Sequence, residues 1–251
     1  MVNGQFWIVT VLCQMLLLAG CSQTPVARMD HYLGISSLGT AAGTPVLSDR
    51  AGPFDAGLLV INDCSAPDSA PALSDKARAF LTDQVKRLIE PLLPIRIATV
   101  LSLSEPSVPA DVQTGRRLAQ EQAVPYLLLA LFSSAESEVP ASLGLDGSPE
   151  QGGGRPNLPG LEANNYALAE LALVDVATGQ LVARAEGRAW SQLLRLYVPI
   201  KSNAYPVIHR SLRNAPIYPP EDEAKDVLRG IAGDEALEQA VMHLQEFWST
   251  R

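Results

Sequence analysis

The sequence predicts a single α/β domain with a mixed five-stranded sheet, preceded by a signal peptide and a tether. Three observations support this fold class. Apolar runs typical of buried strands alternate with amphipathic helical segments after residue 56. Two strand-like segments at 166–190 flank a short turn, which is typical of a β-hairpin. The chain then closes with a helical stretch at 221–248. The predicted order is therefore β-α-β-α-β, then a β-hairpin and C-terminal helices.

Residues 1–20 have the features of a signal peptide. The stretch from Phe6 to Ala19 is almost entirely apolar, and it is shorter than the roughly 20 residues that a membrane-spanning helix needs. The run ends in "LAGC", residues 18–21, which resembles the lipobox of bacterial lipoprotein precursors. That resemblance implies cleavage between Gly20 and Cys21, and transfer of a diacylglyceryl group to the Cys21 thiol.

The lipobox resemblance also implies where the protein resides. A mature N-terminus with several acyl chains is stably anchored, because one chain alone gives only marginal membrane binding. Ser22 follows the cysteine, where an Asp would resemble the pattern for retention at the inner membrane. We therefore expect an outer-membrane lipoprotein whose domain faces the periplasm. A signal-like helix with an accidental cysteine is the alternative.

Charge and cysteine content limit the possible partners. The formal net charge is −8, and residues 1–20 contain no charged side chain, so the negative charge belongs to the rest of the chain. This balance disfavours nucleic acid as a partner. Of the three cysteines, Cys13 lies in the signal and Cys21 is the predicted lipid site. Cys64 is then the one free thiol, expected to be a buried, inert side chain, and no intramolecular disulfide can form.

Residues 21–55 are predicted to be a lipidated N-terminus and flexible tether, and residues 56–251 the α/β domain. The tether is rich in Gly, Ser, Thr and Pro, and a flexible coil of this length reaches roughly 30 Å. The apolar content of "HYLGISSLG", residues 31–39, leaves open that part of it docks on the domain.

The first half of the domain alternates strands and helices. Residues 57–62 form an apolar run typical of a buried strand. Ser74 is placed to cap a helix whose apolar residues recur at helical spacing until Pro91 and Pro94 end it. Residues 95–103 alternate with a strand's period of two, 110–123 fit a second helix, and 126–132 form another continuous apolar strand.

The second half is predicted as a loop, a hairpin and broken helices. Residues 140–165 contain so many Gly and Pro that we expect a long loop and no regular element. Strands at 166–176 and 181–190 should be joined by a turn with Gly179 in the left-handed region. We expect the C-terminal helical stretch to break at Gly233, with Asp234 capping its second part.

Three local patterns and the element order resemble the CsgG/LpoB/PelC-type superfamily of periplasmic lipoproteins. The patterns are "QEQAVPYLLLALFSS", the hairpin "LALVDVATGQLVARAEG" and the amphipathic helix before "IRIATVLSL". The resemblance covers residues 57–190, about half of the chain. It implies a non-catalytic accessory, assembly or regulatory factor of an envelope complex, in cell-wall synthesis or in polysaccharide or protein export. It supplies no catalytic residue.

Enzymatic signatures are absent from the sequence after residue 20. There is no HExxH, GxSxG, Walker A, GxGxxG, EF-hand or CxxC pattern. His31, His209 and His243 are scattered, so a metal site would require tertiary coincidence. We therefore expect no enzyme, no metal and no cofactor other than the covalent lipid on Cys21.

The predicted interaction surface is residues 191–220, which carry a local charge of +4 and no acidic residue. Tyrosine and arginine are common anchors of protein interfaces. An irregular segment whose tyrosines simply pack on the domain is an equally plausible interpretation. The docking hypothesis expects an acidic envelope protein or a polyanionic glycan as partner, and its candidate residues are Arg195, Tyr197, Lys201, Tyr205, Arg210 and Arg213.

Two further classes of function remain open. The chain could be a homo-oligomeric subunit of an export apparatus, although a loop at 140–165 would not supply the long strands of a pore. It could also be a ligand-binding or glycan-binding protein, or an enzyme, with a site assembled only in three dimensions.

Overall fold

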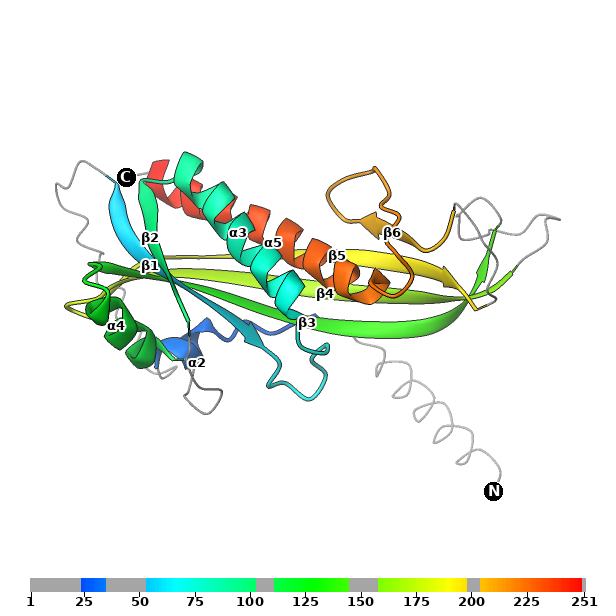
Figure 1. Cartoon of the computed structure of the whole chain (residues 1–251), viewed down its shortest axis with the longest axis horizontal. Coiled ribbons are helices and arrows are strands. Elements are labelled where there is room, and N and C mark those ends of the chain that lie inside the picture. The colour runs from blue at the N-terminus through cyan, green and yellow to red at the C-terminus, as the bar shows by residue number, and fades with distance from the viewer. Residues whose placement is uncertain (1–23, 35–52, 103–110, 145–157, 198–203, 250–251) are drawn as a thin grey trace, which may run out of the picture.

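The computed structural model describes residues 24–34, 53–102, 111–144, 158–197 and 204–249 (Figure 1). It contains a mixed α/β domain with one curled six-stranded sheet, in the order β2-β1-β3-β4-β5-β6. Strands β2 (Ile95–Leu101), β1 (Phe54–Asp63) and β3 (Tyr126–Leu143) are parallel, while β4 (Leu158–Asp175), β5 (Leu181–Leu196) and β6 (Val207–Arg210) continue the sheet antiparallel. The α/β class is confirmed, and the predicted strand number was one too low.

The missed strand is β6, which lies inside the segment predicted as an irregular docking surface. It has four residues and pairs with Ser191–Leu194 at the edge of β5. Four residues are too few to show the alternation of apolar and polar side chains that marks a strand in a sequence. The strand is defined mainly by its pairing with β5.

Helices cover the two faces of the sheet unequally (Figure 1). One face is covered by α3 (Asp75–Leu92) and the long α5 (Ala224–Ser249), and we call it the helix face. The opposite face is covered by α4 (Val112–Glu121) and the short α2 (Met29–Leu33), and we call it the strap face. Each face has its own apolar cluster, so the sheet is the middle layer of the domain.

Local signals place α3, α4 and the hairpin turn as the sequence predicts. Ser74 accepts a hydrogen bond from the Ala77 amide at 3.1 Å and so caps α3. Asp111 caps α4 in the same way through the Thr114 amide at 2.8 Å. Gly179 has φ +74° in the turn between β4 and β5, a conformation that glycine adopts without strain.

The predicted loop at 140–165 is wrong over most of the part that the structure describes. β3 runs to Leu143 and β4 starts at Leu158, and the two strands pair along their whole lengths, from Tyr126↔Asp175 to Leu143↔Leu158. The strands form an arm that extends beyond β1 and β2 (Figure 1). Pro140 is exposed and lies beyond the end of β1, where β3 has a free edge, so its missing N–H costs no ladder bond there. Gly160 is buried, and a Cβ there would clash with Leu143 and the Arg195 carbonyl, so glycine permits the close packing of the arm. Residues 145–157 lie outside the described part.

The predicted break at Gly233 is also wrong, since α5 is continuous from Ala224 to Ser249. A Cβ at Gly233 would lie 3.2 and 3.3 Å from the two δ carbons of Leu81. The glycine therefore permits close approach of α5 to α3. Asp234, predicted as a cap, lies within the helix and is mostly buried. No described helix has the length and apolar character required to span a membrane.

Candidate functional site

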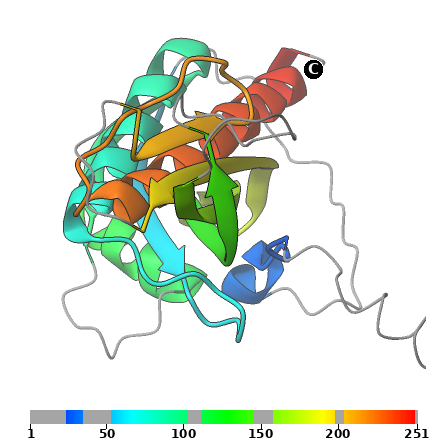
Figure 2. The ribbon, with the colours of Figure 1, turned by 90° about the vertical axis from the view of Figure 1, so that its right-hand side faces the viewer.

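Residues 24–34, here called the strap, lie along the strap face and are not a flexible tether (Figures 1 and 2). Met29 is fully buried in the apolar cluster beneath α4, together with strand residues such as Leu129. The helix α2 ends at Gly34, which has φ +66°. The flexible-tether prediction is therefore corrected for this part, and docking, left open for 31–39, is found for 24–34. Residues 1–23 and 35–52, including Gly20, Cys21 and the rest of the tether, lie outside the described part.

Glu170 is the central contact of the strap with the sheet. It is completely buried on β4, yet its carboxylate accepts hydrogen bonds from the Arg28 amide at 2.8 Å and the Met29 amide at 3.1 Å. Arg184 on β5 donates to the same carboxylate at 3.1 Å and also pairs with Asp30 of the strap. A buried carboxylate needs such partners, so strap and sheet satisfy each other.

A second set of contacts fixes the two ends of the strap. Near its start, Arg188 donates to the Pro25 carbonyl at 2.8 Å. Near its end, burial and the neighbouring Asp63 carboxylate raise the pKa of the Tyr32 hydroxyl to about 12. Tyr32 thus stays neutral against the apolar cluster throughout the physiological pH range.

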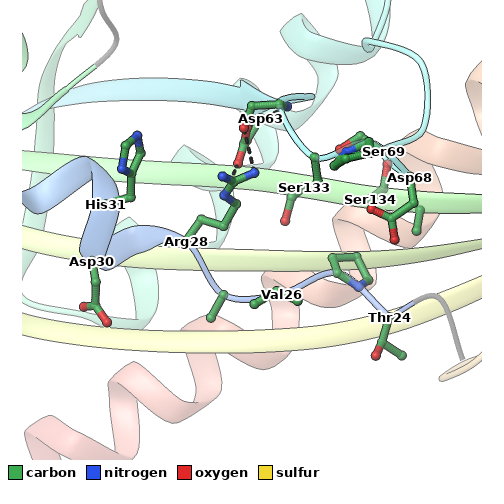
Figure 3. Close-up of a pocket in the computed structure, with 16 residues that line it drawn as sticks. Thr24, Val26, Arg28, Asp30, His31, Asp63, Asp68, Ser69, Ser133 and Ser134 are labelled. Carbon is green, nitrogen blue, oxygen red and sulfur yellow. Dashed lines mark hydrogen bonds and ion pairs between the residues drawn. The ribbon is translucent and has the colours of Figure 1, made fainter. Parts of the chain in front are cut away.

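The strap forms one wall of a pocket of about 440 Å³ (Figure 3). The opposite wall is built from the end of β1, the segment that follows it, and β3, which contributes Ser133 and Ser134. Asp63, the last residue of β1, is buried, and its Oδ1 accepts hydrogen bonds from the Ser65 amide at 2.9 Å and the Ser65 hydroxyl at 2.5 Å. Arg28 reaches across from the strap to place Nε 3.4 Å from Asp63 Oδ2.

The pocket lies where strands β1 and β3 run parallel and β1 ends. Ligands in α/β folds commonly bind at the carboxyl ends of parallel strands. The volume also falls within the range of about 300–1,000 Å³ that is typical of small-molecule sites. Among the described residues, no group of three or more His, Cys, Asp or Glu side chains could hold a metal ion.

The residues predicted for partner binding are dispersed over β5, β6 and the segments beside them. Arg195 lies 3.4 Å from Glu221, Arg213 pairs with Glu238, and Arg210 donates to the Ala215 carbonyl at 2.9 Å. Tyr197 is exposed, whereas Tyr205 is buried and donates its hydroxyl to the Gly144 carbonyl at 2.5 Å. Lys201 lies outside the described residues. A docking role for these residues stays a prediction, and most of their described cations have partners within the chain.

The remaining reactive candidates are not assembled into a site. His31 lines the pocket on the strap, His209 lies on β6, and His243 contacts the Glu186 carbonyl from α5. Cys64 is exposed, contrary to expectation, because β1 ends one residue before it. Partial burial of its sulfur and the Asp63 charge raise the pKa of the Cys64 thiol, which disfavours the reactive thiolate.

Glu170 and Asp63 were not among the residues predicted from the sequence. Glu170 had a usable signal, since it is the one charged residue in the otherwise apolar stretch Tyr166–Val174. A carboxylate on the interior of a strand that is buried on both faces requires a partner, although the partner's identity, 142 positions away, is not encoded locally.

The comparisons with known proteins give structural neighbours only. No protein-family model and no curated protein sequence matches the chain. Solved structures that are similar include a PelC dodecamer from Paraburkholderia phytofirmans, with 13% identity, a TM-score of 0.33, and coverage of 77% of this chain and 88% of that one. The hypothetical protein CT253 from Chlamydia trachomatis has 10% identity, a TM-score of 0.35, and coverage of 80% and 100%. A putative neuraminyllactose-binding hemagglutinin homolog from Helicobacter pylori has 10% identity, a TM-score of 0.37, and coverage of 80% and 89%.

Proposed function

We propose that this protein is an outer-membrane lipoprotein, facing the periplasm, that acts without catalysis as an accessory or assembly factor of an envelope complex. The observation that carries the membrane position is the distance of the strap from the lipobox cysteine, while the accessory role rests on the resemblance described in the sequence analysis. Thr24, the first described residue of the strap, lines the pocket and follows Cys21 by three residues. Three residues span at most about 11 Å. A lipid on Cys21 would therefore hold the domain directly against the membrane.

The surface of the domain next to Thr24 carries aromatic side chains, which suit a position at the membrane. Trp190 is 41% exposed and lies on β5 two residues after Arg188, which holds the start of the strap. Because side chains alternate along a strand, Trp190 lies on the strap face with Arg188. Tyr166 is its direct cross-strand neighbour on β4. Tryptophan and tyrosine are favoured at the boundary between lipid and water.

The first test asks whether the chain is lipidated. Cells that express the full chain are labelled with radioactive palmitate, beside cells that express Cys21→Ser. We expect label on the first protein and none on the variant. Equal labelling of the two proteins, or none of either, would contradict the lipoprotein assignment.

The second test asks whether the domain lies at the membrane. Cleavage before Cys21 leaves Trp190 and Trp248, so Trp248→Phe makes Trp190 the sole tryptophan of the mature protein. In vesicles, lipids brominated near the headgroup should quench its fluorescence, and the Cys21→Ser form should be quenched far less. Palmitate labelling without quenching would retain the anchor and reject the close membrane position.

The accessory role is tested by crosslinking in cells, followed by detergent extraction and mass spectrometry of the co-purified proteins. One dominant envelope protein is the expected result. Replacement of Arg210 and Arg213 by Glu should abolish its capture if residues 191–220 are the docking surface. Self-crosslinks alone would instead favour the homo-oligomeric export subunit.

A further inference from the structure

The pocket beside the strap contains a buried hydroxyl with no hydrogen-bond partner among the described residues. Ser133 is 7% exposed, and its Oγ has no hydrogen-bond partner among the described residues. Asp63 is 3% exposed and has partners, since its Oδ2 is ion-paired with Arg28 at 3.4 Å and its carboxylate also interacts with the Tyr32 hydroxyl. Both residues line the pocket. Buried polar atoms are rarely left unpaired, so the Ser133 hydroxyl at this cavity points to a missing ligand.

The lining of the pocket defines the chemistry of that ligand. Hydroxyl groups are supplied by Thr24, Ser69, Ser133 and Ser134, as Figure 3 shows on both walls. Of the three carboxylates that line it, Asp30 pairs with Arg184 and Asp63 with Arg28, which leaves the Asp68 carboxylate without a charged partner among the described residues. An excess of carboxylates repels phosphate groups and acidic sugars. Carboxylates and serine hydroxyls bind ligand hydroxyl groups well, because each can accept a hydrogen bond from them.

The pocket also has apolar surface beside its polar groups. Pro25 and Val26 of the strap line it, and so do Pro67 and Ala135. A ligand with many hydroxyls on its edge and C–H groups on its faces would satisfy both kinds of surface. Sugars have this combination, whereas a purely apolar molecule would leave the Ser133 hydroxyl unpaired.

We propose that the pocket between the strap and strands β1 and β3 binds a neutral sugar residue. Its hydroxyls bond to Asp63 and Ser133, and its ring packs against Pro25 and Val26. Because one wall is the strap, an occupied pocket also links the strap to the sheet. The proposal rests on the pocket alone and does not depend on lipidation of Cys21.

The test is saturation-transfer NMR of the full chain in a zwitterionic detergent, since detergents with sugar headgroups would compete. The probes are methyl glycosides of glucose, galactose, mannose and N-acetylglucosamine, with glucuronic and sialic acid as acidic counterparts. We expect transfer to at least one neutral glycoside and much weaker transfer to both acids. No transfer to any neutral glycoside, or stronger transfer to the acids, would overturn the proposal.

Matched variants locate the binding. Ser133→Leu fills the pocket and should weaken binding at least tenfold, whereas Ser137→Leu, four residues along the same face of β3 and outside the pocket, should leave it unchanged. Equal affinities of the two variants would reject the pocket as the site. If circular dichroism shows that Ser133→Leu is unfolded, Ser133→Ala replaces it, with an expected loss of about three- to tenfold for one hydrogen bond. An unchanged affinity of Ser133→Ala would then count against the proposal.

Discussion

The two faces of the sheet are closed in different ways. On the helix face, α3 and α5 bury a continuous apolar cluster, and Gly187 of β5 allows the backbone of α5 to approach directly. On the strap face, the same strands present Glu170 and Arg184, and the strap covers them through backbone hydrogen bonds and an ion pair. Both faces bury an apolar cluster, but the strap face also holds buried polar groups whose partners come from a segment far away in the sequence.

The largest effect is expected at the helix face, from Gly187→Ala. A Cβ there would lie closer to the Ala236 carbonyl and the Ala240 amide than real contacts allow. Because backbone atoms cannot rotate away, α5 must shift as a whole. We expect a loss of about 3 kcal/mol in the free energy of unfolding. Thermal unfolding of this variant and of the wild type measures it, and an unchanged midpoint would show that α5 is not in close contact with β5.

The second effect concerns the strap face, where Glu170→Gln removes the buried charge. The glutamine side chain has one carbonyl oxygen in place of two carboxylate oxygens. This oxygen cannot accept hydrogen bonds from the Arg28 and Met29 N–H groups and from Arg184 at once, so the strap should detach. We expect a loss of about 2 kcal/mol, below the usual cost of breaking a buried pair because Arg184 is partly exposed. Hydrogen exchange at the Met29 amide should accelerate. The matched control is Glu186→Gln on the same face, an exposed pair worth at most about 0.5 kcal/mol.

Two buried serines extend the comparison of the two faces: Ser191 lies under α5 and Ser133 lines the pocket beside the strap. Ser191 donates its hydroxyl to the Leu228 carbonyl of α5 at 2.8 Å, whereas the Ser133 hydroxyl has no described partner. Ser191→Ala should therefore cost about 1 kcal/mol, and Ser133→Ala should lie within about 0.5 kcal/mol of the wild type. Chemical denaturation of both variants checks this. A large loss for Ser133→Ala would mean that its hydroxyl has a partner in the free protein.

The smallest effect is a pH dependence from Asp234 on α5. Burial, with Glu238 as the largest neighbouring charge, raises the pKa of the Asp234 carboxyl above its ordinary 3.8. The folded state then binds the proton more tightly than the unfolded state. The resulting stabilisation is complete below pH 3.8 and is lost as the pH rises through the raised pKa. Asp234→Asn should remove this decline and slightly increase stability at pH 7, as measured by urea titration at several pH values.

Elements with strong local signals were predicted correctly, and those fixed by distant partners were not. The Ser74 cap and the Gly179 turn define α3 and the hairpin from neighbouring residues alone. In contrast, Gly233 was interpreted as a helix break because its contact with Leu81 is not visible in the sequence. The arm of β3 and β4 was hidden by Gly160 and Pro140, which pair in the sheet despite their low strand preference.

The candidate site was the least predictable part, because the strap and Glu170 are 142 positions apart. Residues 22–34 have many polar and small side chains, which is typical of a tether. The contacts that dock the strap, with the Glu170 carboxylate and with the apolar cluster around Met29, come from distant parts of the chain. The residues predicted for binding in 191–220 were selected by charge, without their partners Glu221 and Glu238 in view.

The maximum distance between the domain and Cys21 has two values, one with the strap docked and one with it detached. The strap also determines which contacts a pulling force would load first. When the chain is held at Cys21, the load passes first to the hydrogen bond between Arg188 and the Pro25 carbonyl. It passes next to the hydrogen bonds of Arg28 and Met29 with Glu170, before it can reach the sheet through β1. While these bonds hold, three residues limit the domain to about 11 Å from its anchor point. Once they yield and α2 unwinds, the 33 steps from Cys21 to Phe54 permit up to about 120 Å, with the sheet and helices α3, α4 and α5 intact.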